Sequence, residues 1–176
     1  MTGPSTKSDS VTRRRTKPAR LFRDAYVTKF GEEDRKTLFA LYRLDRLPEH
    51  WPFAKGMDAK EFLVRLDEFL PAQFDYGWSV RNKQGPLMLI FAAQTAHFVM
   101  VEDYMPAPRA RSRGVMEAMA RFFDDMRKES VLFVRGEGQW KYLLWRLANY
   151  GILGHVGRIY GVGVYNGSSQ LFQTRK

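Results

Sequence analysis

The sequence AHFVMVEDYMPAPRARSRGVMEAM, residues 96–119, joins a strand pattern to a helix pattern through a basic loop. The apolar run Phe98–Val101 predicts a buried strand, and the apolar spacing that follows Gly114 predicts a helix. A helix start exposes unpaired N–H groups and carries the positive end of the helix dipole. Because three arginines of residues 109–113 lie beside this start, the stretch predicts a site that holds an anion such as a diphosphate group.

The composition predicts one soluble domain without metal or disulfide. The chain has 176 residues, of which 44% are hydrophobic, which is enough for one core. It contains no cysteine, which excludes disulfides and thiolate catalysis, and His50, His97 and His155 lie far apart without the spacing of metal ligands. No apolar run approaches the roughly 18 residues that a membrane span needs, and the N-terminus lacks the apolar core of a signal peptide. We expect no metal, no membrane span and synthesis in the cytoplasm.

Much of the positive charge lies at the N-terminus. The formal net charge is +10, and residues 1–20 carry six basic residues and one acidic residue, a net charge of +5. This segment is polar and has no apolar periodicity, so we expect a disordered basic arm over residues 1–21 and a folded domain over residues 22–176. The arm could contact nucleic-acid phosphates or an acidic protein surface, or it could be a solvated tail that aids solubility. The residues assigned to such contacts are Arg13, Arg14, Arg15, Lys17 and Arg20.

Hydrophobic periodicity predicts the order strand, two helices, three strands, helix, strand, helix, two strands. A capping pair at Asp58 and Glu61 starts the second helix, and Pro71 stops it. The dipeptide Asn166-Gly167 predicts a hairpin between the last two strands. The predicted strands are 24–30, 74–82, 87–93, 98–101, 131–134, 155–164 and 169–173, and the predicted helices begin near 32, 59, 115 and 139.

The last predicted helix, over about residues 139–149, has two different faces. Trp140 lies on the same face as three leucines, and Gly151 stops the helix. Tyr142 and Trp145 lie on another face, interleaved with basic residues, a composition that surfaces for single-stranded nucleic acid use. We favour core packing for Trp140, whereas Tyr142 and Trp145 could form an interface patch.

This order of elements, with a basic glycine loop between the fourth strand and its helix, resembles the GNAT (GCN5-related N-acetyltransferase) family over about residues 25–176. In that family the loop has Gln or Arg, two residues, Gly, one residue, then Gly or Ala, and its backbone amides hold the pyrophosphate of acetyl-CoA. The matching residues here run from Arg111 to Met116. The resemblance implies an α/β (α+β) fold with a central mixed, mostly antiparallel sheet and helices on both faces. It also implies acetyl-CoA as cofactor, held by Val99, Val101, Arg111, Ser112, Arg113, Gly114 and Val115.

The chain departs from the family pattern at positions that bind or protonate the cofactor. Met116 stands where the family has Gly or Ala, and a bulky side chain there could crowd the close approach of the backbone. A later signature of the family has an Asn near the start of the next helix, a Tyr four residues before a Gly, and a Phe after that Gly. With Gly151 taken as that glycine, Trp140 stands at the Asn position. Leu147 replaces a tyrosine that is usually the general acid for the departing thiolate, and Leu cannot donate a proton. Tyr150 lies near in sequence but on a different helical face. The resemblance therefore implies a degenerate acetyl-CoA site.

A catalytic base would lie at the end of the fourth strand, where Glu102 and Asp103 are found. A carboxylate beside an apolar strand could accept a proton from an ammonium group, directly or through water. Adjacent residues of a strand face opposite ways, so at most one would enter the cleft, and we choose Glu102. The alternative is that both carboxylates only balance the nearby arginines.

Three functions follow from this resemblance. The C-terminal sequence and the missing tyrosine are most similar to small GNAT-like proteins of short-tailed bacteriophages, some of which are virion or internal head proteins. That similarity implies, first, a structural virion component, made in the host cytoplasm, whose arm binds neighbouring virion proteins or packaged DNA. The alternatives are a cytoplasmic N-acetyltransferase that uses acetyl-CoA on an unknown amine and, third, a free DNA-associated protein. A homo-oligomer is a further option.

Overall fold

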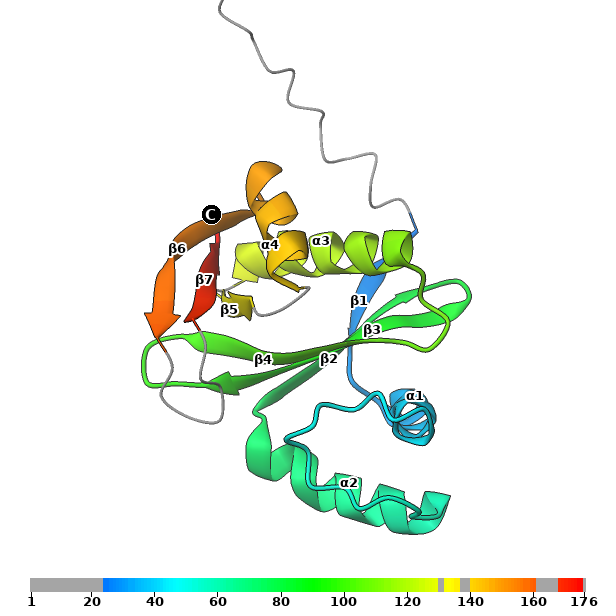
Figure 1. The fold of residues 1–176 in the computed structure, drawn as a ribbon. Helices are drawn as coiled ribbons and strands as arrows, with labels where there is room; N and C mark the ends of the chain where they lie inside the picture. The colour runs from blue at the N-terminus through cyan, green and yellow to red at the C-terminus, as the bar shows by residue number, and fades with distance from the viewer. Residues whose placement is uncertain (1–23, 130–131, 137–139, 161–167, 176) are drawn as a thin grey trace, which may run out of the picture.

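The computed structural model describes residues 24–129, 132–136, 140–160 and 168–175 (Figure 1). In these residues seven strands form one sheet, with α1 and α2 on one face and α3 and α4 on the other. No helix in the described ranges is long and apolar enough to cross a membrane. The strands are β1 (Tyr26–Lys29), β2 (Tyr76–Asn82), β3 (Gly85–Gln94), β4 (Val99–Pro106), β5 (Leu132–Gly136), β6 (Leu153–Tyr160) and β7 (Ser168–Thr174). The helices are α1 (Glu32–Arg43), α2 (Ala59–Gln73), α3 (Ser112–Glu129) and α4 (Trp140–Asn149).

The sheet has the strand order β1-β2-β3-β4-β5-β7-β6. Neighbouring strands run antiparallel except β4 and β5, which are parallel. A parallel pair requires a crossover connection, and α3 supplies it between the end of β4 and the start of β5. The predicted order of elements and the mixed, mostly antiparallel sheet are confirmed. The N-terminal arm, residues 1–21, and the Asn166-Gly167 turn lie outside the described residues.

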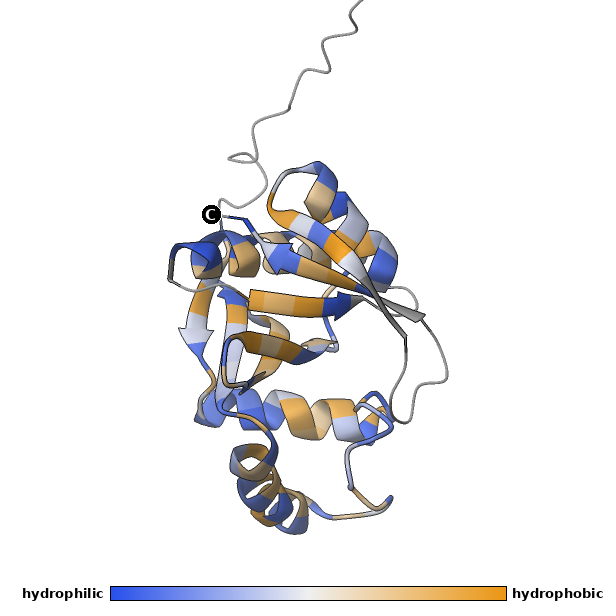
Figure 2. Ribbon diagram, turned by 90° about the vertical axis from the view of Figure 1, so that its left-hand side faces the viewer, coloured by the Kyte–Doolittle hydropathy of each residue, from blue (hydrophilic) through white to orange (hydrophobic). Residues whose placement is uncertain are grey.

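Two apolar clusters hold the helices to the sheet, one on each face. The cluster under α3 and α4 includes the fully buried rings of Phe122 and Phe123. The cluster under α1 and α2 is largely aromatic, and the ring of Trp51 lies 4.9 Å from that of Phe69 and 5.6 Å from that of Phe91. Figure 2 shows apolar residues, in orange, along the strands of the sheet. The sheet is therefore buried on both faces, as expected where helices cover both sides.

The second helix starts where the sequence predicts but does not stop at Pro71. Asp58 Oδ1 accepts a hydrogen bond from the Glu61 N–H at 2.8 Å, which caps the start of α2. α2 continues to Gln73, so the predicted stop is wrong. Proline removes one donor, but this loss falls in the last turn, and the Phe74 N–H still donates to the carbonyl of Leu70 at 2.9 Å.

The fourth strand is longer than predicted. β4 runs from Val99 to Pro106, so Glu102 and Asp103 lie within the strand and not at its end. This acidic pair interrupts the apolar run that indicates a buried strand in the sequence. The structure accommodates it with a β-bulge and with polar partners for Asp103, both of which belong to the candidate site.

Candidate functional site

The predicted anion site is a hollow at the start of α3. The helix begins at Ser112, and its first backbone bond runs from the Val115 N–H to the carbonyl of Arg111 at 3.0 Å. Helix geometry therefore leaves the N–H groups of Ser112, Arg113 and Gly114 without an acceptor inside the helix. This helix start borders a hollow of about 450 Å³. The hollow is lined by Gln84, Leu87, Arg109, Ala110, Arg111, Arg113, Gly114 and Glu117.

Arg109 is held at this hollow by the turn between β2 and β3. Its Nε donates to the carbonyl of Pro86 at 3.3 Å. Gly85 in this turn has a φ of +112°, and a Cβ on it would lie 2.7 Å from Nη2 of Arg109. The positive φ favours glycine in this turn, and the small residue leaves room for the guanidinium of Arg109 beside it. The guanidinium of Arg109 therefore adds a positive charge beside the positive end of a helix, which suits an anion.

β4 and β5 separate soon after they begin. Both strands continue beyond their shared register, to Pro106 and Gly136, and over the described residues no further pairs join them. The last shared pair is Val101 with Val134, so the two described strands part beyond this pair. We call this point the fork. The pairs before it are Val99 with Leu132, Met100 with Phe133 and Val101 with Val134.

Tyr104 crosses the gap between the separated strands. Its hydroxyl donates to the carbonyl of Arg135 at 2.8 Å. Its ring meets the ring of Trp140 edge-on, with centroids 4.5 Å apart. Trp140 is partly buried against the core under α3 and α4, which confirms the predicted packing of this residue. The gap beyond the fork therefore contains a phenol that is held from both strands.

Glu102 is the extra residue of a β-bulge at the fork. The register with β3 pairs Phe91 with Asp103, but the next residue, Ala92, with Val101. A bulge bends the strand and re-aims its side chains. We expected only one of the two carboxylates to enter the cleft, because adjacent residues of a regular strand face opposite ways. That rule does not apply at a bulge.

The carboxylate of Glu102 lies near a basic side chain of β5. Its Oε2 is 3.8 Å from Nη2 of Arg135, and both side chains are partly exposed. An ion pair of this length and exposure contributes little to stability. The position agrees with both interpretations of Glu102, as a base at the fork and as a charge partner of an arginine.

Asp103 belongs to a polar cluster that sequence reasoning missed. The Trp51 indole N–H donates to its Oδ2 at 2.9 Å, and His50 Nε2 lies 3.1 Å from the same oxygen. The Asp103 side chain is buried, whereas that of His50 is 42% exposed. A buried carboxylate that orients a partly exposed imidazole is an arrangement used in acid–base catalysis. Trp51 and His50 precede Asp103 by 52 and 53 residues in the chain. In the sequence, the one sign of this cluster is therefore a histidine that lies far from the aspartate.

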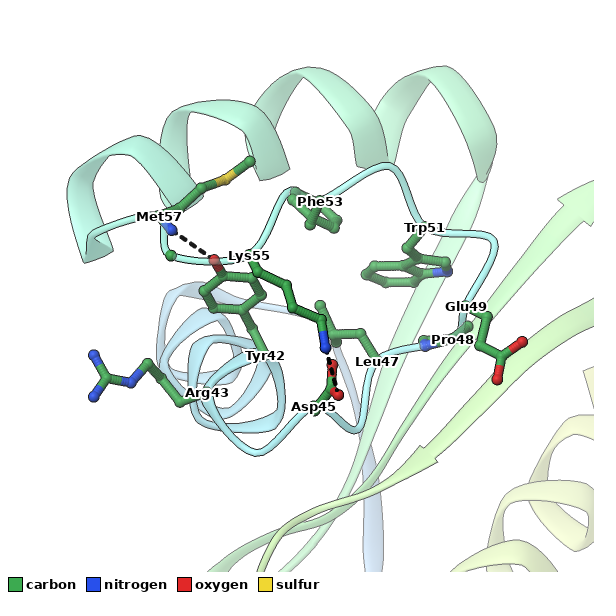
Figure 3. A pocket seen from close by; sticks show the side chains of 11 residues that line it. Tyr42, Arg43, Asp45, Leu47, Pro48, Glu49, Trp51, Phe53, Lys55 and Met57 are labelled. Carbon is green, nitrogen blue, oxygen red and sulfur yellow. Dashed lines mark hydrogen bonds and ion pairs between the residues drawn. The ribbon is translucent and has the colours of Figure 1, made fainter.

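A second hollow, of about 640 Å³, lies in the connection between α1 and α2 (Figure 3). Its wall combines aromatic and charged side chains. Figure 3 shows the Tyr42 hydroxyl bonded to the backbone of Met57, and Lys55 paired with Asp45. Trp51 is also part of the wall. This tryptophan therefore borders the hollow and at the same time binds the buried aspartate at the fork.

The residues that depart from the family pattern are mostly buried. Met116 packs in the core under α3 and is not part of the wall of the basic hollow, so the expected crowding of that hollow is not observed. Helix periodicity explains this, because Met119 follows it by three residues and lies in the same core. Leu147 is fully buried, and Tyr150 lies just beyond α4 with part of its ring exposed. In the described residues, no three His, Asp or Glu side chains gather in a way that could hold a metal ion.

The arrangement of strands and helices is shared with solved acetyltransferase structures. A mutant spermidine N-acetyltransferase from Vibrio cholerae has a TM-score of 0.59 at 9% identity, over 85% of this chain and 92% of that chain. A protein from Corynebacterium glutamicum, described as histone acetyltransferase HPA2 and related acetyltransferase, gives 0.56 at 11% identity, over 86% and 96%. A GNAT-family acetyltransferase from Bacillus cereus gives 0.54 at 12% identity, over 86% and 97%. The sequence matches no protein-family model and no curated protein.

At these identities the likeness shows the fold, and the chain has the GNAT-like fold that its sequence predicts. None of the three structures bears on a bacteriophage relationship, which stays a prediction. The assignments of Glu102 and of the cofactor residues also stay predictions. The structure places Arg111, Arg113 and Gly114 at one hollow and Val101 and Glu102 at the fork.

Proposed function

We propose that this protein binds acetyl-CoA at the start of α3 and transfers its acetyl group to an amine. The observation that carries the proposal is the basic hollow, because it combines helix N–H groups that have no acceptor inside the helix with three arginines, on a fold used by acetyltransferases. The separation of β4 from β5 beyond Val101 supports it further, since an extended amide-bearing chain could lie between the two strands.

The residues around the hollow suit a diphosphate group. Backbone donors of Ser112 to Gly114 and the guanidinium groups of Arg109 and Arg111 would hold it, because charge-assisted hydrogen bonds to phosphate are strong. Arg113 would contribute less, since it is paired with Glu117 at 2.9 Å. When bound, acetyl-CoA supplies an activated thioester. The protein then contributes by holding the cofactor and the amine in the orientation that the reaction needs, which can account for a large part of a rate enhancement.

We assign to Glu102 the removal of the proton from the attacking amine. It lies in the bulge at the fork, next to the cluster of Asp103 and His50. This cluster and the second hollow share Trp51, so we place the entry of the amine on the face of the sheet that α1 and α2 cover. Leu147 is buried and apolar, so this chain has no phenol at the family's acid position, and we expect slow turnover.

Calorimetric titration of the full chain with acetyl-CoA tests the binding step. Binding at a hundredfold excess over Kd raises the free energy of unfolding by about 2.7 kcal/mol, which a thermal melt also detects. Replacing Arg109 and Arg111 together by Gln weakens binding about tenfold or more, because bonds to charged groups contribute about 1.5–3 kcal/mol each. The control replaces Lys60 and Arg65, two exposed residues of α2, by Gln and removes the same charge. No heat and no stabilisation at millimolar acetyl-CoA would contradict the proposal.

Release of free thiol from acetyl-CoA, with a panel of primary amines and polyamines as acceptors, tests the transfer step. Glu102→Gln lowers kcat by about 10²- to 10⁴-fold, the usual contribution of a general base, and leaves the affinity for acetyl-CoA unchanged. Glu68→Gln, at an exposed position on α2, is the matched control. An unchanged kcat in Glu102→Gln would assign this residue to charge balance with Arg135 instead.

The structural virion role is the first of the three functions that the resemblance implies, and it stays a prediction. It depends on the arm, which lies outside the described residues. If it holds, particles purified from the source contain this chain in a fixed copy number.

A further inference from the structure

We infer that the outer face of α4 binds single-stranded nucleic acid by stacking bases on Tyr142 and Trp145. This face consists of Lys141, Tyr142, Trp145 and Arg146 and is called the α4 outer face. It shares no residue with the basic hollow of α3 or with the fork. The inference therefore does not depend on the proposed acetyl transfer.

Two large rings on this face are exposed although α4 is otherwise well packed. Tyr142 is 73% exposed and Trp145 is 36% exposed. Their spacing of three residues places them on the same side of the helix, one turn apart. On the opposite side, Leu144 and Leu147 are fully buried. Packing against the core therefore explains why leucines occupy the buried side of α4. It does not explain why a large ring occupies position 142.

Trp145 is held in place while part of its ring stays accessible. It stacks on His155 with ring centroids 4.6 Å apart and an interplanar angle of 28°. It also meets Phe172 edge-on at 5.3 Å. An aromatic group that is already ordered loses less conformational entropy when a ligand stacks on it. The α4 outer face thus has one rigid ring and, one turn away, one open ring.

The charged side chains of the C-terminal part of the chain, which includes α4, are all basic. No acidic side chain occurs after Glu137 in the sequence, whereas residues 138–176 carry five Lys or Arg residues. Lys141 and Arg146 are both exposed on α4 beside the two rings. Two exposed basic side chains beside the rings attract a polyanion, and a second copy of this chain would bring the same positive charge to the interface.

Single-stranded nucleic acid matches both features. Its phosphates are attracted to Lys141 and Arg146, and its unpaired bases present flat faces to aromatic rings. An acidic peptide would use the charge but has no need of two exposed rings. In a duplex the bases are already stacked on each other, so their faces are not available to Tyr142.

Fluorescence anisotropy of a labelled oligo(dT) of about 12 nucleotides with the full chain tests the stacking. Tyr142→Ala weakens binding about tenfold, whereas Tyr142→Phe keeps the ring and binds like the unaltered chain. Tyr142 is so exposed that its removal leaves the fold intact, which a thermal melt verifies. Tyr26→Ala is the control, because Tyr26 is an exposed aromatic residue on β1, at the other edge of the sheet.

The salt dependence of the same binding tests the charge. Replacing Lys141 and Arg146 by Gln lowers the slope of log K against log salt by about 1.4, or about 0.7 for each phosphate that is no longer neutralised. The control replaces Lys36 and Lys60, exposed residues of α1 and α2, by Gln and removes the same charge. The N-terminal arm is present in every variant, so the differences between variants report on the α4 outer face.

Three results would overturn the inference. Equal affinity of Tyr142→Ala and the unaltered chain would exclude stacking on this face. Equal affinity for a duplex of the same length would show that charge alone accounts for binding. Displacement of the oligonucleotide by acetyl-CoA, with loss of acetyl-CoA affinity in Tyr142→Ala, would assign the face to the cofactor.

Discussion

Asp103 has a buried carboxylate whose Oδ2 accepts the Trp51 indole N–H and lies close to the ring of His50. Removing one member of such a group leaves the other polar atoms buried without their partner, which costs more than the bond itself contributes. The pair of Lys55 and Asp45 is the opposite case, because its side chains are 85% and 79% exposed and water screens them.

Asp103→Ala therefore lowers the free energy of unfolding by about 2 kcal/mol, since the Trp51 N–H loses its acceptor in a buried place. Asp45→Asn, which removes the same charge and suits the positive φ of this position, lowers it by about 0.5 kcal/mol or less. Urea denaturation of both variants gives the two values. Equal losses would mean that the Asp103 carboxylate has no special role in the fold.

At the scale of residues, the sequence predicts those parts of the site that are close together in the chain. Arg111, Arg113 and Gly114 could be recognised because a helix start and its loop are local structures. The cluster of His50 and Asp103 could not, because it forms only when the α1–α2 connection packs against β4. Met116 shows a related limit, because a motif position does not tell on which side of the helix the side chain lies.

At the scale of elements, an ion pair between buried Asp34 and partly buried Arg81 joins the first turn of α1 to β2. Asp34 Oδ1 is 2.7 Å from Nη1 of Arg81, and Asp34 Oδ2 accepts the Gly31 N–H at 2.9 Å. The same carboxylate therefore caps the helix and fixes its start against the sheet. Glu33 also contacts Arg81, at 2.6 Å, but its side chain is exposed.

Asp34→Ala accordingly lowers the free energy of unfolding by about 3 kcal/mol, since a partly buried arginine loses its main partner and α1 loses its cap. Glu33→Gln keeps Asp34 in place and lowers it by about 1 kcal/mol or less. Chemical denaturation measures both. A loss in Glu33→Gln as large as that in Asp34→Ala would assign the stabilising role to the exposed glutamate.

Apolar periodicity predicts the order and type of the elements. It does not predict where α2 and β4 end. α2 passes Pro71 because one missing donor near a helix end is tolerated. β4 passes Glu102 and Asp103 because a bulge and the partners of Asp103 accommodate the acidic pair. In both cases interactions made in the folded chain outweigh a local signal.

At the scale of the whole molecule, the division into an arm of residues 1–21 and a domain of residues 22–176 stays a prediction. The described core begins at Ala25, which is buried. Removing residues 1–21 therefore leaves Tm within about 2 °C of the full chain, because the packing of the described core is retained. Retention on a DNA column at low salt falls, since half of the net charge is removed with the arm. A fall in Tm of many degrees would show that the arm is part of the fold.

The sheet is joined in its middle by only three described residue pairs, between β4 and β5. Cooperative units of local unfolding tend to follow such weak connections. The backbone amides of β5, β6 and β7 would then open together, in an event separate from the opening of β2 and β3. In deuterated water the two groups would take up deuterium at two different rates, with a boundary that falls between the strands around the proposed acetyl-transfer site.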